Sequence, residues 1–464
     1  MTISNRSAES ERDVAYLLHP ITNYRIHEEI GPFTLERGEG IRVFDTDGKS
    51  YIDGMAGLWC ASLGFSEPRL AAAAQRQMEV LPYESIFAHR SNLPCIDLAE
   101  ALINRAPVPM SKVMFQTSGS EAIDTAIKLV WYYQDACGKP NKRKMISRTR
   151  SYHGTTIASA SLTGQAPMHN GFGLPIADFI QTGSPHYYRD AREDETEEQF
   201  ASRLAQELEE QIVREGPDLV GAFFAEPVIG AGGVILPPST YFEKIQAVLN
   251  KYDILLVADE VICGFCRTGN YWGSQTYGMK PDILVCAKAL SAAYFPISAV
   301  MINDSIYQAI ADQSQKLGAF AHGYTYGGHP VGAAIALETL RIYDNDDILG
   351  HVRTVSPTLQ QGYQGLADHP MIGNVRGVGL LAAVEFMADK ERKIPFDPSL
   401  KVPVKVMDAA RERGILLRAL GDSLVCSPPL IITPSEIEEI VAGLTAAVDQ
   451  VHDWARTQQD TVPA

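Results

Sequence analysis

The chain has 464 residues, of which 45% are hydrophobic and 21% are charged, as is ordinary for a globular protein. A chain of this length is too long for one small hydrophobic core, so we expect two domains with a large shared interface. The formal net charge of −16 opposes binding to nucleic-acid phosphates, and no cluster of Lys and Arg offsets it. We therefore expect no nucleic-acid partner.

Neither the N-terminus nor the cysteines indicate an exported, membrane-bound or metal-binding protein. The first residues lack a basic segment followed by an apolar core, and no apolar run reaches the roughly eighteen residues of a membrane span, so we expect a cytoplasmic protein without membrane contact. Seven cysteines are an odd number scattered over a long chain, which argues against a disulfide framework. Cys263 and Cys266 form a C-x-x-C without a second pair, so we expect packing thiols and no metal.

The first hundred residues contain one clear β signal between helical stretches. Residues 1 to about 22 are typical of a polar lead-in with a short helix. Over residues 42–59, alternating apolar side chains flank the pair Asp47-Gly48, which predicts a β-hairpin that ends near Trp59. Phe87 lies between two later stretches of helical periodicity, where core packing is the default interpretation for an aromatic side chain.

The next informative stretch predicts a phosphate site. A short apolar strand runs into Ser118, Gly119 and Ser120, and a helical pattern follows. Ser118 and Glu121 fit the S-x-x-E capping box. A helix N-terminus with free backbone N–H groups, and a glycine that permits close approach, is a ready anion site. Such a cap alone is usually only a cap, but the motifs described below favour phosphate binding here.

Two further strands end next to polar or small residues. Tyr152 and His153 follow a short strand, and His153 could be a hydrogen-bonding neighbour of a site or a plain loop residue. Glu226 follows a long apolar run and leads into a Gly-rich turn that contains Ala231. Small residues in this turn either permit the turn itself or leave room for a substrate.

Two apolar runs, residues 254–258 and 283–287, lead to Asp259 and Lys288. Such runs predict buried parallel strands whose carboxyl ends deliver polar groups to a crevice. A desolvated lysine has a lowered pKa and can form a Schiff base, and an aspartate keeps a pyridine nitrogen protonated. Either residue alone would be read as a surface group at a strand end. Together they predict a pyridoxal 5′-phosphate (PLP) site.

The order of these elements predicts an α/β fold. Buried strands that alternate with helices, each followed by polar groups, indicate a largely parallel sheet with a ligand outside its carboxyl ends. The C-terminal part mixes short strands and helices and predicts a smaller α+β domain. Residues 377–382 match the dinucleotide fingerprint G-x-G-x-x-A, but the residues that follow alternate like a strand, so we reject a nicotinamide site.

The segments VADEVICGFCRTG and PDILVCAKALSAAYFPISAV resemble the class III aminotransferases, which are fold-type I enzymes that use PLP, and in particular their ω-amine:pyruvate branch. The resemblance extends from about Asn23 to the last helix. It implies an aspartate aminotransferase-like fold with a mostly parallel, seven-stranded-type sheet. The implied parts are an N-terminal segment, 1–60, that packs with the small domain, a large PLP-binding domain, 61–329, and a small α+β domain, 330–464.

The resemblance also implies roles for single residues. Lys288 would bind PLP covalently and Asp259 would contact its pyridine nitrogen, while Ile123 stands where the family usually has Asn. The other implied cofactor contacts are Ser118, Gly119, Ser120, Tyr152, His153, Glu226, Val261 and Thr325, the last reaching the cofactor of a neighbouring subunit. The implied substrate contacts are Trp59, Phe87, Tyr152, Ala231 and Arg418, with Phe87 reaching in from the partner subunit and Arg418 as a mobile clamp for a carboxylate.

The expected function is transfer of an amino group from a primary amine or ω-amino acid to pyruvate or a similar keto acid, with pyridoxamine phosphate (PMP) formed midway. A shared site implies a homodimer, possibly a tetramer. The amine stays open, because taurine, β-alanine, diamines and aryl amines all fit. An aminomutase or a decarboxylase of the same fold is also open, and a nicotinamide-dependent dehydrogenase is the disfavoured alternative from another class.

Overall fold

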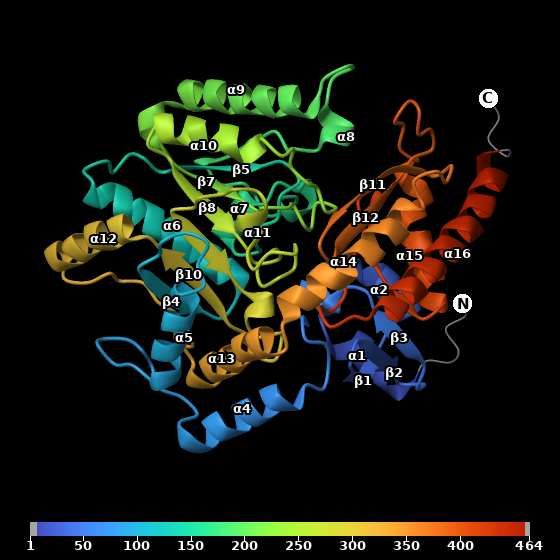
Figure 1. The fold of residues 1–464 in the computed structure, drawn as a ribbon, viewed down its shortest axis with the longest axis horizontal. Coiled ribbons are helices and arrows are strands. Elements are labelled where there is room, and N and C mark those ends of the chain that lie inside the picture. Colours follow the sequence, from blue (N-terminus) through green and yellow to red (C-terminus); the bar gives the residue numbers. More distant parts are fainter. Residues whose placement is uncertain (1–6, 460–464) are drawn as a thin grey trace.

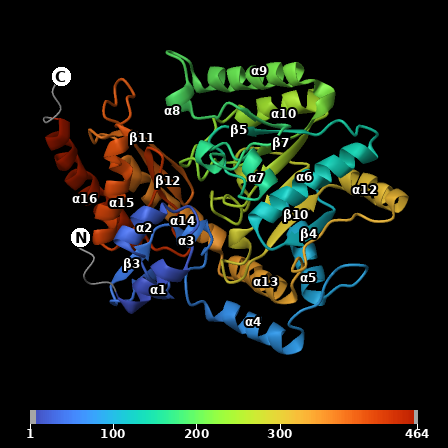
Figure 2. The same cartoon turned by 180° about the vertical axis from the view of Figure 1, so that it is seen from behind.

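A computed structural model describes residues 7–459 of the chain, with side chains up to residue 455. Helices cover both faces of a central sheet, and the N-terminal strands lie beside the C-terminal helices at one end of the molecule (Figure 1). Figure 2 shows the same N-terminal strands and C-terminal helices from behind.

The large domain is built on a sheet of seven strands in the order β4-β10-β9-β8-β7-β5-β6. Neighbouring strands run parallel except at β10, which is antiparallel to both β4 and β9. The mostly parallel sheet expected from the sequence is confirmed. Its strands are β4 (Lys112–Gln116), β5 (Lys144–Arg148), β6 (Phe179–Thr182), β7 (Val220–Ala225), β8 (Leu255–Asp259), β9 (Ile283–Cys286) and β10 (Ser298–Ile302).

Both faces of this sheet are buried, which explains why its strands are apolar runs without alternation. In β7, Phe223 packs with the helices on one face and Phe224 packs with those on the other, because successive side chains point to opposite sides. Helices α9 (Glu197–Glu215) and α10 (Tyr241–Lys251) cover the first face. The second face is covered by α6 (Gly119–Ala136), α7 (Ile157–Leu162) and α12 (Asp304–Leu317).

A third group of helices extends the large domain below the sheet edge formed by β4. Helix α13 (Pro330–Asn345) packs on α4 (Pro68–Val80) and α5 (Leu93–Ile103). The chain then passes along α14 (Ile348–Gln364) into the small domain. The boundary at residues 329 and 330 stays a prediction from the sequence.

The small domain is a four-stranded antiparallel sheet in the order β11-β12-β15-β14, covered by helices. Strands β11 (Ile372–Val378) and β12 (Leu381–Phe386) form a hairpin across the G-x-G-x-x-A match, so a strand and not a helix follows the glycines. None of the described helices is both long and apolar enough to cross a membrane. The other elements are β14 (Arg418–Leu420), β15 (Ser423–Cys426), α15 (Val402–Glu412) and α16 (Pro434–Gln459).

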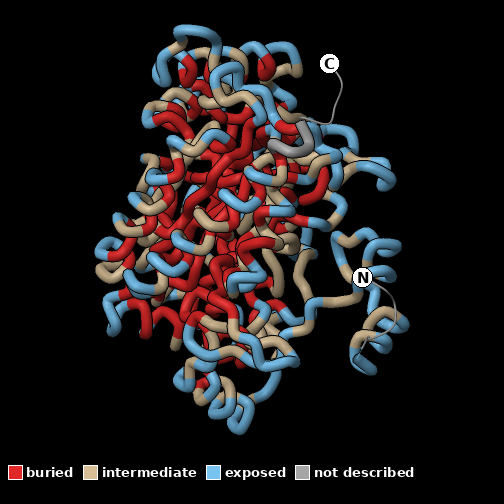
Figure 3. The backbone as a smooth tube through the Cα atoms, turned by 90° about the vertical axis from the view of Figure 1, so that its right-hand side faces the viewer, coloured by how far each residue is buried: buried red, intermediate tan, exposed pale blue. Residues whose placement is uncertain are grey.

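The N-terminal segment joins the C-terminal chain through a second four-stranded sheet, β1-β2-β3-β13. The expected hairpin is confirmed as the antiparallel pair β2 (Arg42–Asp45) and β3 (Ser50–Asp53), preceded by β1 (Leu35–Glu39). Strand β13 (Ile415–Leu416) pairs in parallel with β3. Helices α1 (Ala8–Tyr16) and α2 (Tyr24–Ile30) lie outside the buried core, where the tube is mostly exposed (Figure 3).

A buried ionic network joins the two domains. Glu385 on β12 pairs with Arg376 of β11 and with Arg189 of α8 (Tyr187–Asp190), and His186 contacts the same carboxylate at 3.1 Å. Burial alone would raise the pKa of Glu385, but the His186 hydrogen bond and the Arg376 and Arg189 charges lower it below its ordinary value. The stabilisation is therefore present above the unfolded pKa of about 4.3 and is lost as the pH falls through the folded value.

We expect Glu385→Gln to destabilise the fold by about 3 to 5 kcal/mol, because Arg376 would remain buried without its counter-charge. The measurement is the unfolding midpoint of the variant in urea. Glu338→Gln is the matched control, since Glu338 pairs with Arg341, whose side chain is 64% exposed, and such pairs contribute about 0 to 1 kcal/mol. A midpoint for Glu385→Gln equal to that of the control would contradict the structural role of the network.

Candidate active site

The carboxyl ends of the parallel strands meet at one edge of the large sheet. Because β10 is antiparallel to both β4 and β9, β4 runs in the direction of β9 and also ends at this edge. A cavity of about 400 Å³ lies there, as expected for a ligand site of an open α/β sheet. Of the residues predicted for the site, the cavity is lined by Trp59, Gly119, Ser120, Tyr152, His153, Glu226, Ala231, Asp259, Val261, Lys288 and Arg418.

Asp259 ends β8 and is held by a histidine. Its Oδ2 atom lies 2.8 Å from Nδ1 of His153, and the two side chains are 5% and 0% exposed. Its Oδ1 atom accepts a hydrogen bond from the N–H of Val261 at 3.1 Å. His153 is thus a hydrogen-bonding neighbour of the site, which decides between the two interpretations that its sequence position allowed. A carboxylate fixed in this way can serve a ring nitrogen without reorienting.

Lys288 follows β9 and borders the cavity in an enclosed position. Burial lowers the pKa of its ammonium, although Cys60, Asp259 and Glu226 oppose the shift. Its backbone φ of 51° lies in the left-handed region, which costs energy for a residue with a side chain and is common at functional sites. Its Nζ atom lies 5.4 Å from the ring centroid of Trp59. The predicted nucleophilic lysine therefore has the environment that its chemistry requires.

Helix α6 begins at the cavity with an N-terminus that is open to an anion. Ser118 Oγ accepts a hydrogen bond from the N–H of Glu121 at 3.2 Å. The second hydrogen bond of the predicted capping box, from the N–H of Ser118 to the Glu121 carboxylate, is wrong. The Glu121 carboxylate accepts instead from the N–H of Thr117 at 2.8 Å. A Cβ on Gly119 would lie 3.3 Å from Val261. Gly119 therefore lets Val261 and the amides of the first turn approach closely, as a phosphate cradle needs.

Glu226 is fully buried at the end of β7 and organises the loops beside it. Its two carboxylate oxygens accept hydrogen bonds from the N–H groups of Tyr152 at 3.0 Å and Gly230 at 2.9 Å. Burial raises its pKa above the ordinary glutamate value. Glu226 thus fixes the backbone that carries Tyr152 and the start of the turn that carries Ala231.

Trp59 and Arg418 close the cavity from outside the large sheet. Trp59 ends the short segment α3 (Ala56–Trp59) after β3, is 3% exposed and has a buried Nε1 without a hydrogen-bond partner among the described residues. The Arg418 guanidinium lies 5.1 Å from the Trp59 ring centroid, a favourable cation–π distance. Burial lowers the pKa of Arg418. One wall of the cavity therefore combines an apolar ring with a positive charge.

Residues 25–448 match the model of the family described as "Aminotransferase class-III". The chain is a class III aminotransferase. "Gamma-aminobutyrate transaminase 1, mitochondrial" of Oryza sativa subsp. indica is 48% identical over 95% of this chain and 85% of its own length. The "Gamma aminobutyrate transaminase 1, mitochondrial" of Solanum lycopersicum is 47% identical over 92% of this chain and 83% of its own. The solved omega transaminase from Pseudomonas jessenii in complex with PMP is 51% identical, with a TM-score of 0.95 over 97% of this chain and 99% of that one.

As a class III aminotransferase the protein uses PLP and transfers an amino group from an amine to a keto acid. The residues at the cavity fit this cofactor. The α6 N-terminus suits its phosphate, the carboxylate of Asp259 suits its ring nitrogen, and the enclosed amine of Lys288 suits its aldehyde carbon. Because Gly119 adds no side chain where a Cβ would crowd Val261, the phosphate side of the cavity stays accessible.

Three residues predicted for the site of this aminotransferase do not line the cavity: Ser118, which caps α6 beside it, and Phe87 and Thr325, which lie elsewhere in the single chain. Phe87 is 47% exposed, and its ring would lie 2.8 Å from a Cβ on Gly323. The carbonyl of Thr325 accepts a hydrogen bond from the Tyr83 hydroxyl at 2.8 Å. The loops that carry Phe87 and Thr325 are therefore neighbours, and neither residue lines the cavity of its own chain. Their contacts with a second subunit stay a prediction.

The aminotransferase site also includes residues that the sequence analysis did not assign. Ile21 and Met168 line the cavity, and nothing in their local pattern separates them from ordinary apolar residues. Glu260, next to Asp259, lies outside the cavity lining; it is buried and accepts hydrogen bonds from the N–H groups of Gly273 at 2.9 Å and Ser274 at 2.6 Å. Burial raises the pKa of Glu260 to about 7. The position of Glu260 after an apolar strand could have predicted a buried carboxylate. Its hydrogen-bond donors could not be predicted, because they lie thirteen or more residues further along the chain.

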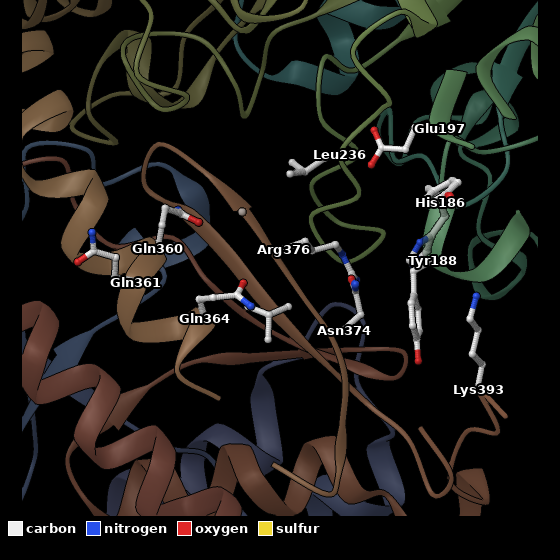
Figure 4. A pocket seen from close by; sticks show the side chains of 13 residues that line it. His186, Tyr188, Glu197, Leu236, Gln360, Gln361, Gln364, Asn374, Arg376 and Lys393 are labelled. Carbon is white, nitrogen blue, oxygen red and sulfur yellow. The ribbon is translucent and has the colours of Figure 1, made fainter. Parts of the chain in front are cut away.

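A second cavity, of about 660 Å³, lies between the two domains and is not the site of amino transfer. Side chains of α8, α14 and β11, among them Gln360, Asn374 and Arg376, line it together with Lys393 from the loop after β12 (Figure 4). Neither Lys288 nor Asp259 lines it. The smaller cavity at the strand ends therefore carries the chemistry.

We expect Lys288→Ala to abolish turnover while PLP still binds without a covalent bond, because the α6 N-terminus and Asp259 remain. Borohydride reduction followed by mass spectrometry of the intact chain should add the cofactor mass to the parent protein only. Lys280→Ala, which removes an exposed lysine, is the control and should behave like the parent. Addition of the same mass to Lys288→Ala would show that another lysine holds the cofactor.

Proposed function

We propose that this aminotransferase takes primary amines or ω-amino acids as donors and pyruvate or a similar small keto acid as acceptor. The observation that carries the proposal is the position of Arg418 over Trp59, beside Lys288. An arginine offers a planar fork for a carboxylate, while the neighbouring indole ring offers an apolar surface. One cavity thus contains what a charged acceptor and an uncharged donor side chain each require.

The chemistry depends on a few groups of the chain once the cofactor is bound. PLP supplies an electron sink and a carbon that exchanges amines. Asp259, oriented by His153, holds a proton at the pyridine nitrogen and thereby maintains that sink. With the cofactor bound, the Nζ atom of Lys288, whose pKa burial lowers, would accept the proton from the substrate carbon that bears the nitrogen and then act as the proton donor in the same half-reaction. Tyr152, fixed through Glu226, offers a flat face to the ring.

Arg418 must serve two half-reactions whose substrates differ in charge. A fixed, enclosed guanidinium facing an apolar amine would be an unpaired charge, which is costly. Arg418 starts β14, three residues before Gly421, whose φ of 56° makes the turn to β15. Its long side chain can pair with a carboxylate and otherwise turn away along the Trp59 ring. The same residue then admits both the keto acid and an uncharged amine.

The donor side of the cavity favours compact or flexible amines with an apolar body. Ala231 borders it from the Gly-rich turn after β7, and Leu58 and Ile262 add further apolar lining. A relative named as a γ-aminobutyrate transaminase at 48% identity supports ω-amino acids as part of the donor range. In that case Arg418 would meet the distal carboxylate of the donor as well as that of the acceptor.

The proposal includes a homodimer with the site at the subunit interface. Phe87 and Thr325 lie in adjacent loops away from their own cavity, a placement that suits contacts with a second copy. Tyr16, Leu18 and Ile30 are strongly exposed in the single chain, and burial of such apolar side chains would favour association. A cytoplasmic location also stays a proposal, and the plant relatives carry the word mitochondrial in their names.

A donor panel tests the proposed substrate class. Purified holoenzyme with pyruvate should form alanine in equal amount to the carbonyl product of each accepted amine, with aryl amines, diamines, β-alanine, taurine and γ-aminobutyrate compared at one concentration. Matched formation of alanine excludes an aminomutase, which does not consume pyruvate, and the absence of released CO2 excludes a decarboxylase. Turnover with 2-oxoglutarate alone, and none with pyruvate, would overturn the proposed acceptor.

We expect Arg418→Ala to slow the reaction of the PMP form with pyruvate by about 10-fold to 150-fold, which corresponds to about 1.5 to 3 kcal/mol for a lost charge-assisted pair. The reaction of the PLP form with an amine that lacks a carboxylate should change little. Stopped-flow absorbance measures the two half-reactions separately.

The control for this variant is Arg411→Ala, which removes a partly exposed arginine of the neighbouring helix α15. It should leave both half-reactions unchanged. Equal losses in both half-reactions for Arg418→Ala would show that Arg418 is structural. No loss in either would assign the carboxylate to another residue.

A further inference from the structure

The N-terminal arm, defined here as residues 8–30, is tied together by three polar side chains. Asp13 comes from α1, His19 from the loop after it, and His27 from α2. Among the described residues, they form the one group of three His, Cys, Asp or Glu side chains whose ligand atoms lie within 4.8 Å of one another. No buried residue lies in either helix, so this cluster is the internal anchor of the arm.

The three ligand atoms converge on one point. Oδ1 of Asp13 lies 2.8 Å from Nε2 of His19 and 3.0 Å from Nε2 of His27. The two imidazole rings are 4.4 Å apart between centroids. The side chains are 19%, 28% and 12% exposed for Asp13, His19 and His27 respectively, so the cluster is shielded on most sides but open on one.

We propose that Asp13, His19 and His27 bind a divalent transition-metal ion, with Zn²⁺ as the best match. Two imidazole nitrogens and one carboxylate oxygen form a typical three-residue ligand set for Zn²⁺, and water completes the coordination. Zinc–ligand bonds of about 2.0 to 2.2 Å require only small outward shifts from the present contacts. The imidazoles bind with their protons on Nδ1, so two metal bonds replace the two hydrogen bonds that Nε2 makes to Asp13.

The loop between the ligands explains what such a metal would do. Ile21 lies in this loop, lines the active-site cavity and is 74% exposed. Its φ of 51° is strained for a β-branched residue and persists only where the surrounding structure imposes it. A metal held by His19 and His27, on either side of Ile21, fixes this rim of the substrate cavity. The ion has no part in amino transfer, since the catalytic groups of the described chain are Lys288 and Asp259.

Hydrogen bonds alone are the competing explanation of the cluster. Two such bonds offset little of the conformational entropy lost when two short helices and their loop become ordered. A metal–ligand set contributes far more to local folding. Packing of the exposed apolar face of the arm on a second copy is compatible with the metal, because that face and the cluster use different side chains.

The first experiment measures metal binding to tag-free holoenzyme after treatment with a chelator and dialysis. Calorimetric titration with Zn²⁺ should show one site per chain, and Co²⁺ should give the visible absorption of a low-coordinate complex. His27→Gln and His19→Gln should each weaken the affinity by more than about 100-fold, since even neighbours of metal ligands contribute 10-fold to 100-fold. Retained absorption of bound PLP shows that the variants are folded.

The matched control is His351→Gln, which removes a histidine of α14 whose Nε2 contacts the carbonyl of Ile432. It should bind Zn²⁺ as the parent does. Absence of saturable binding to the parent, or equal affinity in the parent and His27→Gln, would overturn the proposal.

Limited proteolysis is a second measure that reports on the arm itself. The arm carries Arg12 and Arg25, whose side chains are 70% and 86% exposed. Zn²⁺ should slow tryptic cleavage after these residues in the parent and in His351→Gln, but not in His27→Gln. Equal protection of His27→Gln would place the metal at another site.

Discussion

The enclosed hydrogen bond between His153 and Asp259 is the contact on which the arrangement of the site depends. It connects the carboxyl ends of β5 and β8, so the sheet itself sets the distance between the loops that surround the cofactor site. A carboxylate this deeply buried needs partners to stay in place. His153 and the N–H of Val261 provide them, and Lys288 enters the same cavity from the adjacent strand β9.

Burial governs the electrostatics around this pair. It raises the pKa of Glu226 and lowers the pKa values of Lys288 and Arg418. Each shift favours the neutral form in isolation, yet opposite charges share the cavity and partly compensate one another. The consequence for function is that the ammonium of Lys288 gives up its proton more readily than that of an exposed lysine.

The cavity is a composite of parts that are distant in the chain. The cofactor side belongs to the large sheet, whereas Trp59 comes from the N-terminal segment and Arg418 from the small domain. These two meet because β13, just before Arg418, pairs in parallel with β3, just before Trp59. The Glu385 network then holds the small domain against α8 of the large domain. The arm that carries Ile21 adds a rim whose order we attribute to Asp13, His19 and His27.

The sequence by itself determined the family and the parallel sheet, and it predicted that Asp259, Lys288, Gly119 and Ser120 meet at one cavity. These features depend on local pattern, since an apolar run that ends in a polar residue specifies both a buried strand and the group at its end. Only the tertiary structure decided that His153 contacts Asp259 and that Arg418 lies over Trp59. It also decided which backbone N–H donates to Glu121, and that Ile21 lines the cavity. Each of these depends on which segments meet in space or on side-chain geometry, and such contacts leave no periodic trace in the residues that make them.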